Sequence, residues 1–189
     1  MNQSPLHGSS IEVGTHNGYQ HVIIPHGNGG ITRYFIGAFL LFWLGGWFMG
    51  LTSAADQIMS GNGDAFLIFW LGGWTIGGVF VGYFIYRIFR KSVPEQLLLN
   101  KPNLTVDTGI PPFKISSSMT NQKEYWKSVF PKRTRIEIDH NEMKTLKLRE
   151  TESGNRLTVD TGTERLELAT SATEIESEWL FNYLSQNYS

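Results

Sequence analysis

Two aspartates carry the residue pattern that most directly suggests chemistry. Asp107 and Asp160 each begin an Asp-Thr-Gly triplet, and the six letters LTVDTG occur twice, at 104–109 and 157–162. Two carboxylates about 3 Å apart can share one proton, so that one activates water while the other protonates a peptide carbonyl. The repeat therefore raises the hypothesis of peptide hydrolysis by an aspartate pair.

The surroundings of both triplets favour structural turns over catalysis. The first triplet runs into Ile110-Pro111-Pro112, which cannot easily supply the loop that follows the catalytic triplet of aspartic proteases. The later hydrophobic-hydrophobic-Gly element of that family is missing. The second triplet lies between two short strands, where it fits a tight turn with glycine at positive φ. We predict that the protein is not an enzyme, and an aspartic-protease-like activity remains the weakest alternative.

Histidines near the N-terminus suggest a metal site, but their spacing does not support one. They are His7, His16, His21 and His26. The spacing matches no common ligand pattern, and Glu12 is the only carboxylate nearby. Residues 1–32 are rich in Gly, Ser and Asn, so we predict a flexible tail or partner-contacting arm with one extended piece at 21–25. The chain has no Cys, which excludes disulfides and thiol chemistry. We predict no metal and no cofactor.

Two apolar runs, 34–51 and 66–89, dominate the first half of the chain. Their only ionisable residue is Arg87. At about 1.5 Å per residue, each run can cross a hydrocarbon core of roughly 30 Å. We predict a transmembrane hairpin over 33–91, with helices at about 34–54 and 66–89 and a loop at 55–65. Because no carboxylate, histidine or lysine lies within the runs, transport and intramembrane catalysis are disfavoured.

Basic residues flank the hairpin on one side only. Arg33 precedes it, and Arg87, Arg90 and Lys91 close it, whereas the loop has neither Lys nor Arg. The positive-inside rule therefore predicts that both termini lie in the cytoplasm. The predicted location of the protein is the inner membrane.

The hairpin contains an internal repeat, because residues 42–47 and 69–74 both read FWLGGW. Small residues let helix backbones approach closely in lipid. The expected packing glycines are Gly45, Gly46, Gly50, Gly72, Gly73, Gly77, Gly78 and Gly82. Folding the chain near residues 59–60 should bring the two glycine pairs to the same depth. We expect them to pack within the hairpin, and the extra glycines leave open a contact with another subunit or a second copy.

After residue 91 the hydrophobic period changes from helical to that of strands. The seven predicted strands are 95–99, 104–107, 113–116, 135–139, 145–149, 156–160 and 165–168. A helix follows, with Ser171 and Thr173 as candidate N-caps. Its apolar face is Ile175, Trp179, Leu180, Tyr183 and Leu184, and Glu176 and Glu178 are expected to face water. The fold class is thus an α+β membrane protein, with residues 92–189 forming a small antiparallel barrel or sandwich.

The order of seven strands and one C-terminal helix resembles the pleckstrin-homology-like (PH-like) domain. The chain is similar to bacterial membrane proteins that carry two helices followed by such a domain. The matching stretches are PEQLLLNKPNLTVDTG at 94–109, NRLTVDTGTERLELA at 155–169 and ESEWLFNYL at 176–184. This resemblance implies a membrane-tethered binding or assembly module, and it supplies no catalytic residues.

An aromatic and basic segment interrupts the predicted strands. The expected membrane-surface or partner face is Lys123, Tyr125, Trp126, Lys127, Phe130, Lys132 and Arg133. The alternative is a short helix packed on the end of the barrel. Residues 87–135 have a net charge of +7 and residues 136–189 have −6, which would orient the domain on an anionic leaflet or on a protein. We predict an accessory or scaffold protein that binds membrane subunits or itself, with anionic-lipid binding as the alternative and no nucleic-acid binding.

Overall fold

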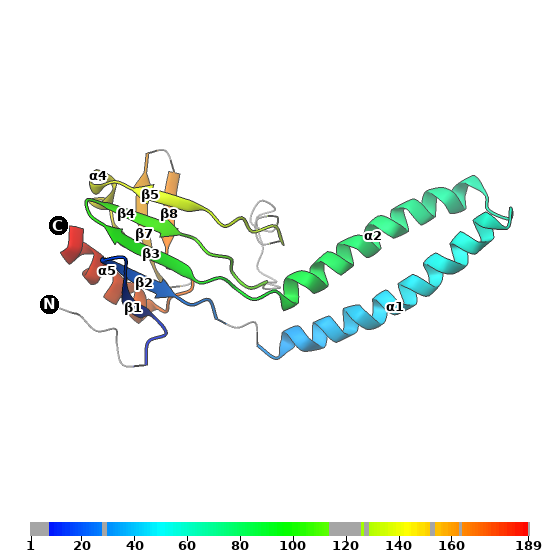
Figure 1. The fold of residues 1–189 in the computed structure, drawn as a ribbon, viewed down its shortest axis with the longest axis horizontal. Helices are drawn as coiled ribbons and strands as arrows, with labels where there is room; N and C mark the ends of the chain where they lie inside the picture. Colours follow the sequence, from blue (N-terminus) through cyan, green and yellow to red (C-terminus); the bar gives the residue numbers. More distant parts are fainter. Residues whose placement is uncertain are drawn as a thin grey trace. The chain divides into compact units, whose positions relative to one another are not determined.

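The computed structural model describes residues 8–27, 30–113, 126, 129–151, 154–162 and 164–188 (Figure 1). Over these residues the fold is α+β, with four helices and two antiparallel sheets of five and three strands. The chain divides into two compact units. We call Met1–Gly27, Ser92–Pro111 and Pro131–Ser189 the sheet domain, and Asn28–Lys91 with Pro112–Phe130 the hairpin unit.

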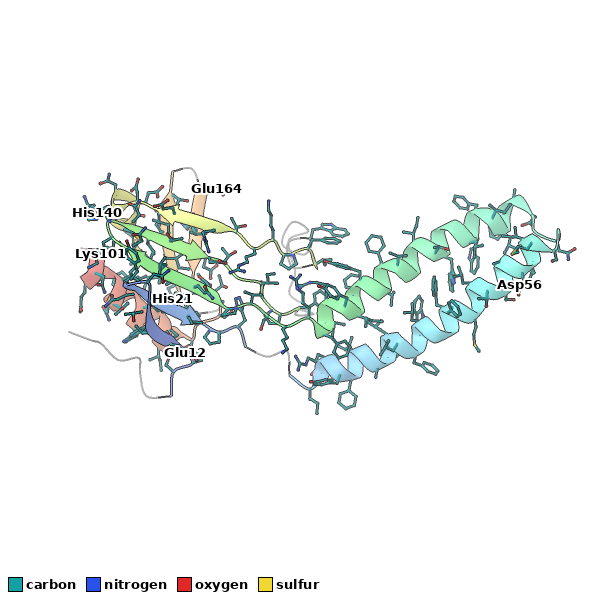
Figure 2. The ribbon with its side chains drawn as sticks, viewed as in Figure 1. Glu12, His21, Asp56, Lys101, His140 and Glu164 are labelled. Carbon is teal, nitrogen blue, oxygen red and sulfur yellow. The ribbon has the colours of Figure 1, made fainter. Side chains whose placement is uncertain are left out.

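The hairpin unit is built on helices α1 (Thr32–Met59) and α2 (Ala65–Phe89). Both are long and apolar enough to cross a membrane, with 28 and 25 residues. Helix α1 continues five residues beyond its predicted end, so the connecting turn is shorter than expected. Asp64 caps α2, because its carboxylate accepts a hydrogen bond of 2.7 Å from the backbone N–H of Leu67. Asp56, near the end of α1, marks the same tip of the hairpin (Figure 2).

The five-stranded sheet has the order β1-β2-β3-β4-β5. Its strands are β1 (Glu12–His16), β2 (Tyr19–Ile24), β3 (Glu95–Asn100), β4 (Asn103–Asp107) and β5 (Arg135–Ile138). The prediction of a flexible tail over 1–32 is therefore wrong for residues 12–20, whereas the extended piece predicted at 21–25 is confirmed over 21–24 as part of β2. Asn17 and Gly18 have φ of 51° and 84°, which is the backbone of a tight hairpin turn. Strand β2 then pairs with β3 across 70 residues of sequence, with Val22 opposite Leu97.

The three-stranded sheet consists of β6 (Lys147–Thr151), β7 (Gly154–Thr161) and β8 (Glu164–Leu168) in sequence order. The short helix α4 (His140–Met143) precedes it, and Asp139 and Glu142 form a reciprocal capping box at its start. These strands confirm the predictions at 156–160 and 165–168 and shift the one at 145–149 by two residues. Most of the strand predicted at 113–116 lies outside the described residues.

One hydrophobic core joins both sheets to helix α5 (Glu174–Tyr188). Fully buried side chains from these three elements include Val22, Leu97, Leu104, Leu157, Leu168, Leu180 and Leu184. The α+β class is thus confirmed for the described residues. The sheets differ from the predicted barrel, because six described strands follow residue 92 and two more come from the N-terminal segment.

Thr173, one of the two predicted N-caps, caps helix α5. The Glu176 N–H donates to Thr173 Oγ1 at 3.3 Å, and the Thr173 N–H donates to Glu176 Oε2 at 2.8 Å. The expected faces are wrong at two positions. Ile175 is 66% exposed, and Glu176 is buried. The reason is that Glu176 also accepts hydrogen bonds from Ser9 and Ser10, which fixes the N-terminal segment on the helix.

Candidate functional site

The two Asp-Thr-Gly aspartates lie on different sheets, and arginines bind each of them. Asp107, on β4, accepts two hydrogen bonds of 2.8 Å from Arg133 Nε and Nη2. Asp160, on β7, accepts one of 2.9 Å from Arg165 Nε. The hydrogen bonds from Arg133 and Arg165 lower the pKa of Asp107 and Asp160. Two carboxylates that are separately neutralised in this way do not match a pair that shares one proton.

Both triplets instead form turns, as their neighbours in the sequence predicted. Gly109 and Gly162 have φ of 60° and 57°. At Gly109 a Cβ would collide with the carbonyl oxygens of Val93 and Pro94. Asp107 Oδ1 also accepts the Gly109 N–H at 3.1 Å. The first triplet therefore fixes the end of β4 against the segment that leads into β3.

The histidine-rich region does not gather a metal-binding group among the residues that the structure describes. His21 lies on β2, and His26 follows that strand and is buried. His7 is outside the described residues. The ring of His26 shares a hydrogen bond with Ser171 Oγ at 2.5 Å, so its described partner is a hydroxyl near the start of α5.

The glycines of the hairpin do not pack as predicted. At seven of them, an added Cβ would have no described atom within 4 Å, apart from its chain neighbours and the adjoining backbone of its own helix. We call these seven the open glycine surface: Gly45, Gly46, Gly50, Gly72, Gly73, Gly77 and Gly82. The expectation that the two glycine pairs pack against each other is therefore wrong, although the reciprocal hydrogen bonds between Trp47 and Trp74 agree with the predicted equal depth. The spacing of a repeat gives depth along each helix, but it does not give the rotation of the helix about its axis.

Only Gly78, among the eight predicted glycines, receives the opposite helix. A Cβ there would collide with the indole ring of Trp47, so the ring occupies the space that this glycine leaves. Near the other end of the hairpin, Gly37 of α1 receives the ring of Phe89 in the same way. The sequence pattern missed Gly37 because it stands outside the repeat.

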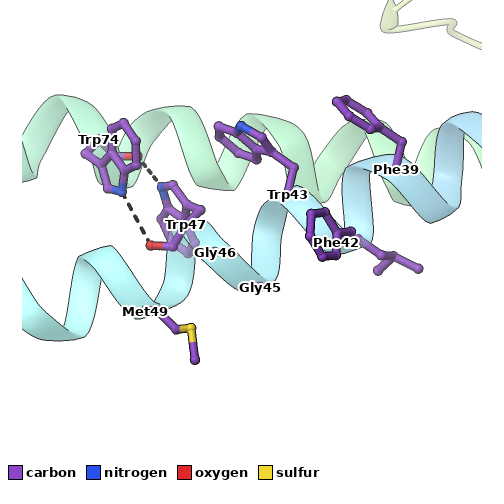
Figure 3. A pocket seen from close by; sticks show the side chains of 9 residues that line it. Phe39, Phe42, Trp43, Gly45, Gly46, Trp47, Met49 and Trp74 are labelled. Carbon is purple, nitrogen blue, oxygen red and sulfur yellow. Dashed lines mark hydrogen bonds between the residues drawn. The ribbon is translucent and has the colours of Figure 1, made fainter.

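Trp47 and Trp74 hold the middle of the hairpin together. The Trp47 Nε1–H donates to the carbonyl oxygen of Trp74 at 3.0 Å, and the Trp74 Nε1–H donates to that of Trp47 at 3.5 Å (Figure 3). These two residues are the last letters of the two FWLGGW copies, so the repeat gives a reciprocal contact. Trp74 also stacks on Trp70 with ring centroids 4.6 Å apart. The expectation that indoles pack over a glycine holds for Trp47.

A groove of about 690 Å³ lies beside Gly45 and Gly46 (Figure 3). Its lining is apolar apart from the indole N–H groups: Phe39, Leu41, Phe42, Trp43, Gly45, Gly46, Trp47, Met49 and Trp74. Phe42 and Met49 are 84% and 74% exposed, so their side chains stand out on either side of the glycine pair. The arrangement is a hollow between large apolar side chains of α1 and the Trp74 side chain of α2.

The predicted aromatic and basic face is divided between the two units. In the hairpin unit, the Tyr83 hydroxyl donates to the Val129 carbonyl oxygen at 3.0 Å, and Phe130 stacks on Tyr83 at 5.1 Å. Trp126 stacks on Phe130 in turn. Lys132 and Arg133 belong to the sheet domain, where Arg133 binds Asp107. Lys123, Tyr125 and Lys127 lie outside the described residues.

No protein-family model, curated protein or solved structure matches this chain.

Proposed function

We propose that the protein is an accessory or scaffold subunit of the inner membrane, with both termini in the cytoplasm. It binds another membrane subunit, or a second copy of itself, through the hairpin, and it catalyses no reaction. The observation that supports this proposal is the open glycine surface. Glycines have no side chain beyond hydrogen, so a second helix in the lipid can approach the helix backbone closely where they lie. Seven glycines at which an added Cβ would meet no atom of a described neighbouring group suit an external partner.

The groove at Gly45 and Gly46 gives this contact a shape. Between two membrane helices, apolar burial provides no net driving force, because lipid tails are themselves apolar. Close packing of one helix into a hollow on the other supplies the attraction instead. A helix whose side chains enter between Phe42 and Met49 would fill the groove of about 690 Å³.

For the sheet domain we propose the PH-like fold family and a protein-binding role. Two antiparallel sheets and a C-terminal helix that share one core agree with that resemblance. Fold likeness alone does not identify a ligand. The arginine pairs at Asp107 and Asp160 favour structural roles for the residues that had suggested chemistry.

The test is the native mass of the tagged full-length chain, extracted from its own cells in a mild detergent. We expect stoichiometric additional subunits or a homo-oligomer with the wild type. Gly46→Leu and Gly73→Leu should each lower the bound fraction about tenfold, because overpacking costs on the order of 1–3 kcal/mol.

Ala38→Leu is the matched control, because Ala38 is an exposed small residue of α1 outside the groove. It should retain the partner. A monomeric wild type, or glycine variants that bind as the wild type does, would contradict the proposed function.

Anionic-lipid binding is the second candidate, and the aromatic stack at the end of α2 favours it. Trp126 and Phe130 are about half exposed. Trp126 stacks on Phe130, and Phe130 stacks on Tyr83, which lies about two turns before the end of α2. Arg90, at the end of the same helix, lies over the Tyr86 ring with 5.9 Å between guanidinium carbon and ring centroid. Aromatic rings and cations together suit a headgroup layer. Retention of anionic lipid, without protein, in the same native mass spectrum would favour this candidate.

A further inference from the structure

A buried carboxylate lies where the chain returns from the hairpin to the sheet domain. Glu95 is the first residue of β3 and follows the end of α2 by six positions. Its side chain is 3% exposed. The structure shows no ion pair between Glu95 and any cation of the described residues. A carboxylate in this setting is expensive to ionise, so its surroundings require an explanation.

Glu95 binds the connection between β8 and α5. Its Oε1 accepts the Ala169 N–H at 2.8 Å, and its Oε2 accepts the Thr170 N–H at 3.2 Å. Ala169 has φ of 55°, a left-handed conformation that is strained for a residue with a Cβ. The two hydrogen bonds therefore hold a backbone that would otherwise relax.

The chain segment entering the hairpin binds the same connection. His26 lies between β2 and α1, six positions before Thr32, and shares its hydrogen bond with Ser171 Oγ. Residues 169–171 are thus attached both to the segment before α1 and to the segment after α2. The cluster therefore includes one residue from the segment before the hairpin, His26, and one from the segment after it, Glu95.

The charged groups around the cluster come from each neighbouring element. Glu167 of β8 raises the pKa of Glu95 and forms an ion pair of 3.2 Å with Arg156 of β7, and Arg156 Nη1 also donates to the Thr170 carbonyl oxygen. At the start of α5, Glu174 is exposed. On β4, Asp107 lies opposite Gln96, the residue after Glu95, and forms an ion pair with Arg133.

Glu176, the remaining acid near the start of α5, stays ionised at neutral pH. Burial alone would raise its pKa, but hydrogen bonds from Thr173, Ser9 and Ser10 outweigh burial and lower the pKa to about 2. Glu95 is therefore the carboxyl group of this cluster that is placed to exchange a proton near neutrality.

We propose that Glu95 and residues 169–171 form a proton-controlled latch, which is closed when Glu95 is protonated and released when Glu95 ionises. In the closed state the protonated carboxyl stays buried against the connection, and its carbonyl oxygen still accepts a backbone N–H. In the released state water reaches the carboxylate and stabilises its charge. The latch would make the packing of the β8–α5 connection against β3, within the sheet domain, respond to cytoplasmic pH, whichever partner the hairpin binds.

The size of the effect follows from proton linkage. Burial raises the pKa of Glu95 to about 7 against the ordinary 4.5, and Glu167 adds to this, while the two backbone hydrogen bonds oppose it. A group with a higher pKa in the closed state favours closure when protonated, so the opening constant rises with pH. Between pH 6 and pH 8 these two values give an increase of about tenfold, within a limit of roughly 300-fold.

Amide hydrogen exchange of the full-length protein in detergent tests the latch directly. The Ala169 and Thr170 N–H groups report its opening once the intrinsic pH dependence of exchange is divided out. We expect their protection in the wild type to be about tenfold lower at pH 8 than at pH 6. In Glu95→Gln, which cannot ionise, protection should change less than twofold between pH 6 and pH 8. The control is Glu164→Gln, on the same strand as Glu167, which should show the pH dependence of the wild type.

Equal wild-type protection at the two pH values would overturn the proposal. An unchanged pH dependence in Glu95→Gln would also overturn it, because the proton would then bind elsewhere. Protection of the β3–β4 amides checks that this variant folds. If Glu95→Gln does not fold, the pH dependence of amide protection in the wild type tests the proposal alone. The latch requires that the protection of Ala169 and Thr170 changes with a midpoint near pH 7, whereas a cluster with only a structural role does not.

Discussion

At the residue scale, Glu176 shows how one buried carboxylate attaches a distant segment. It accepts hydrogen bonds from Ser9 and Ser10 across 166 or more residues of sequence and also closes the cap at Thr173. Hydrogen bonds to a charged group contribute about 1.5–3 kcal/mol each when they are removed singly. We predict that Glu176→Gln lowers the free energy of unfolding by about 1.5–3 kcal/mol at pH 7.

The pH dependence gives this prediction a sign. The pKa of Glu176 is about 2 in the folded protein and 4.5 ordinarily, so the stabilisation is complete above pH 4.5 and is lost towards pH 2. The difference between wild type and Glu176→Gln, measured by denaturant unfolding in detergent, should therefore shrink below pH 4.5. The exposed neighbour Glu178 supplies the control, and an equal loss in Glu178→Gln would argue against a specific anchor.

Residue types predicted the turns better than they predicted the contacts. Gly162 has the positive φ that the Asp-Thr-Gly turn required, and Thr173 is one of the two N-caps that the sequence predicted. Glu95 and Glu176 gave no such signal, since each looks like an ordinary surface carboxylate in its own strand or helix. Their roles depend on backbone N–H groups that only the tertiary fold brings to them.

At the element scale, the N-terminal strands are the largest addition to the predicted fold. The Asn17-Gly18 pair between alternating residues is a hairpin signal that the polar composition of residues 1–32 concealed. Val22 and Ile24 are completely buried, so β2 is part of the core. The long-range pairing of β2 with β3 cannot be inferred from periodicity, because two membrane helices separate these strands in the sequence.

We therefore predict that Ile24→Ala lowers the free energy of unfolding by about 2–5 kcal/mol, as truncation of a buried side chain usually does. Thr15→Ala, at an exposed position of the edge strand β1, should change it by less than about 0.5 kcal/mol. Denaturant unfolding followed by circular dichroism would measure both. If the N-terminal segment stays outside the core, neither substitution should change the free energy of unfolding.

At the scale of the whole molecule, the two ends of the hairpin differ in charge. Asp56 and Asp64 lie at the turn between α1 and α2, whereas Arg33, Arg90 and Lys91 lie at the ends that join the rest of the chain. Cations are retained on the cytoplasmic side of a membrane, and carboxylates influence orientation little. The length and composition of α1 and α2 allow a membrane crossing but do not choose its direction.

We predict that the turn faces the outside of the cell and the sheet domain faces the cytoplasm. The chain has no Cys, so single substitutions can report each side without background labelling. A membrane-impermeant maleimide added to intact cells should label Asn62→Cys in the turn. It should label Lys101→Cys, in an exposed turn of the sheet domain, only after the cells are opened. Labelling of Lys101→Cys in intact cells would show the opposite orientation. The sheet domain would then face the outside, and the Glu95 latch would respond to the external pH instead of the cytoplasmic pH.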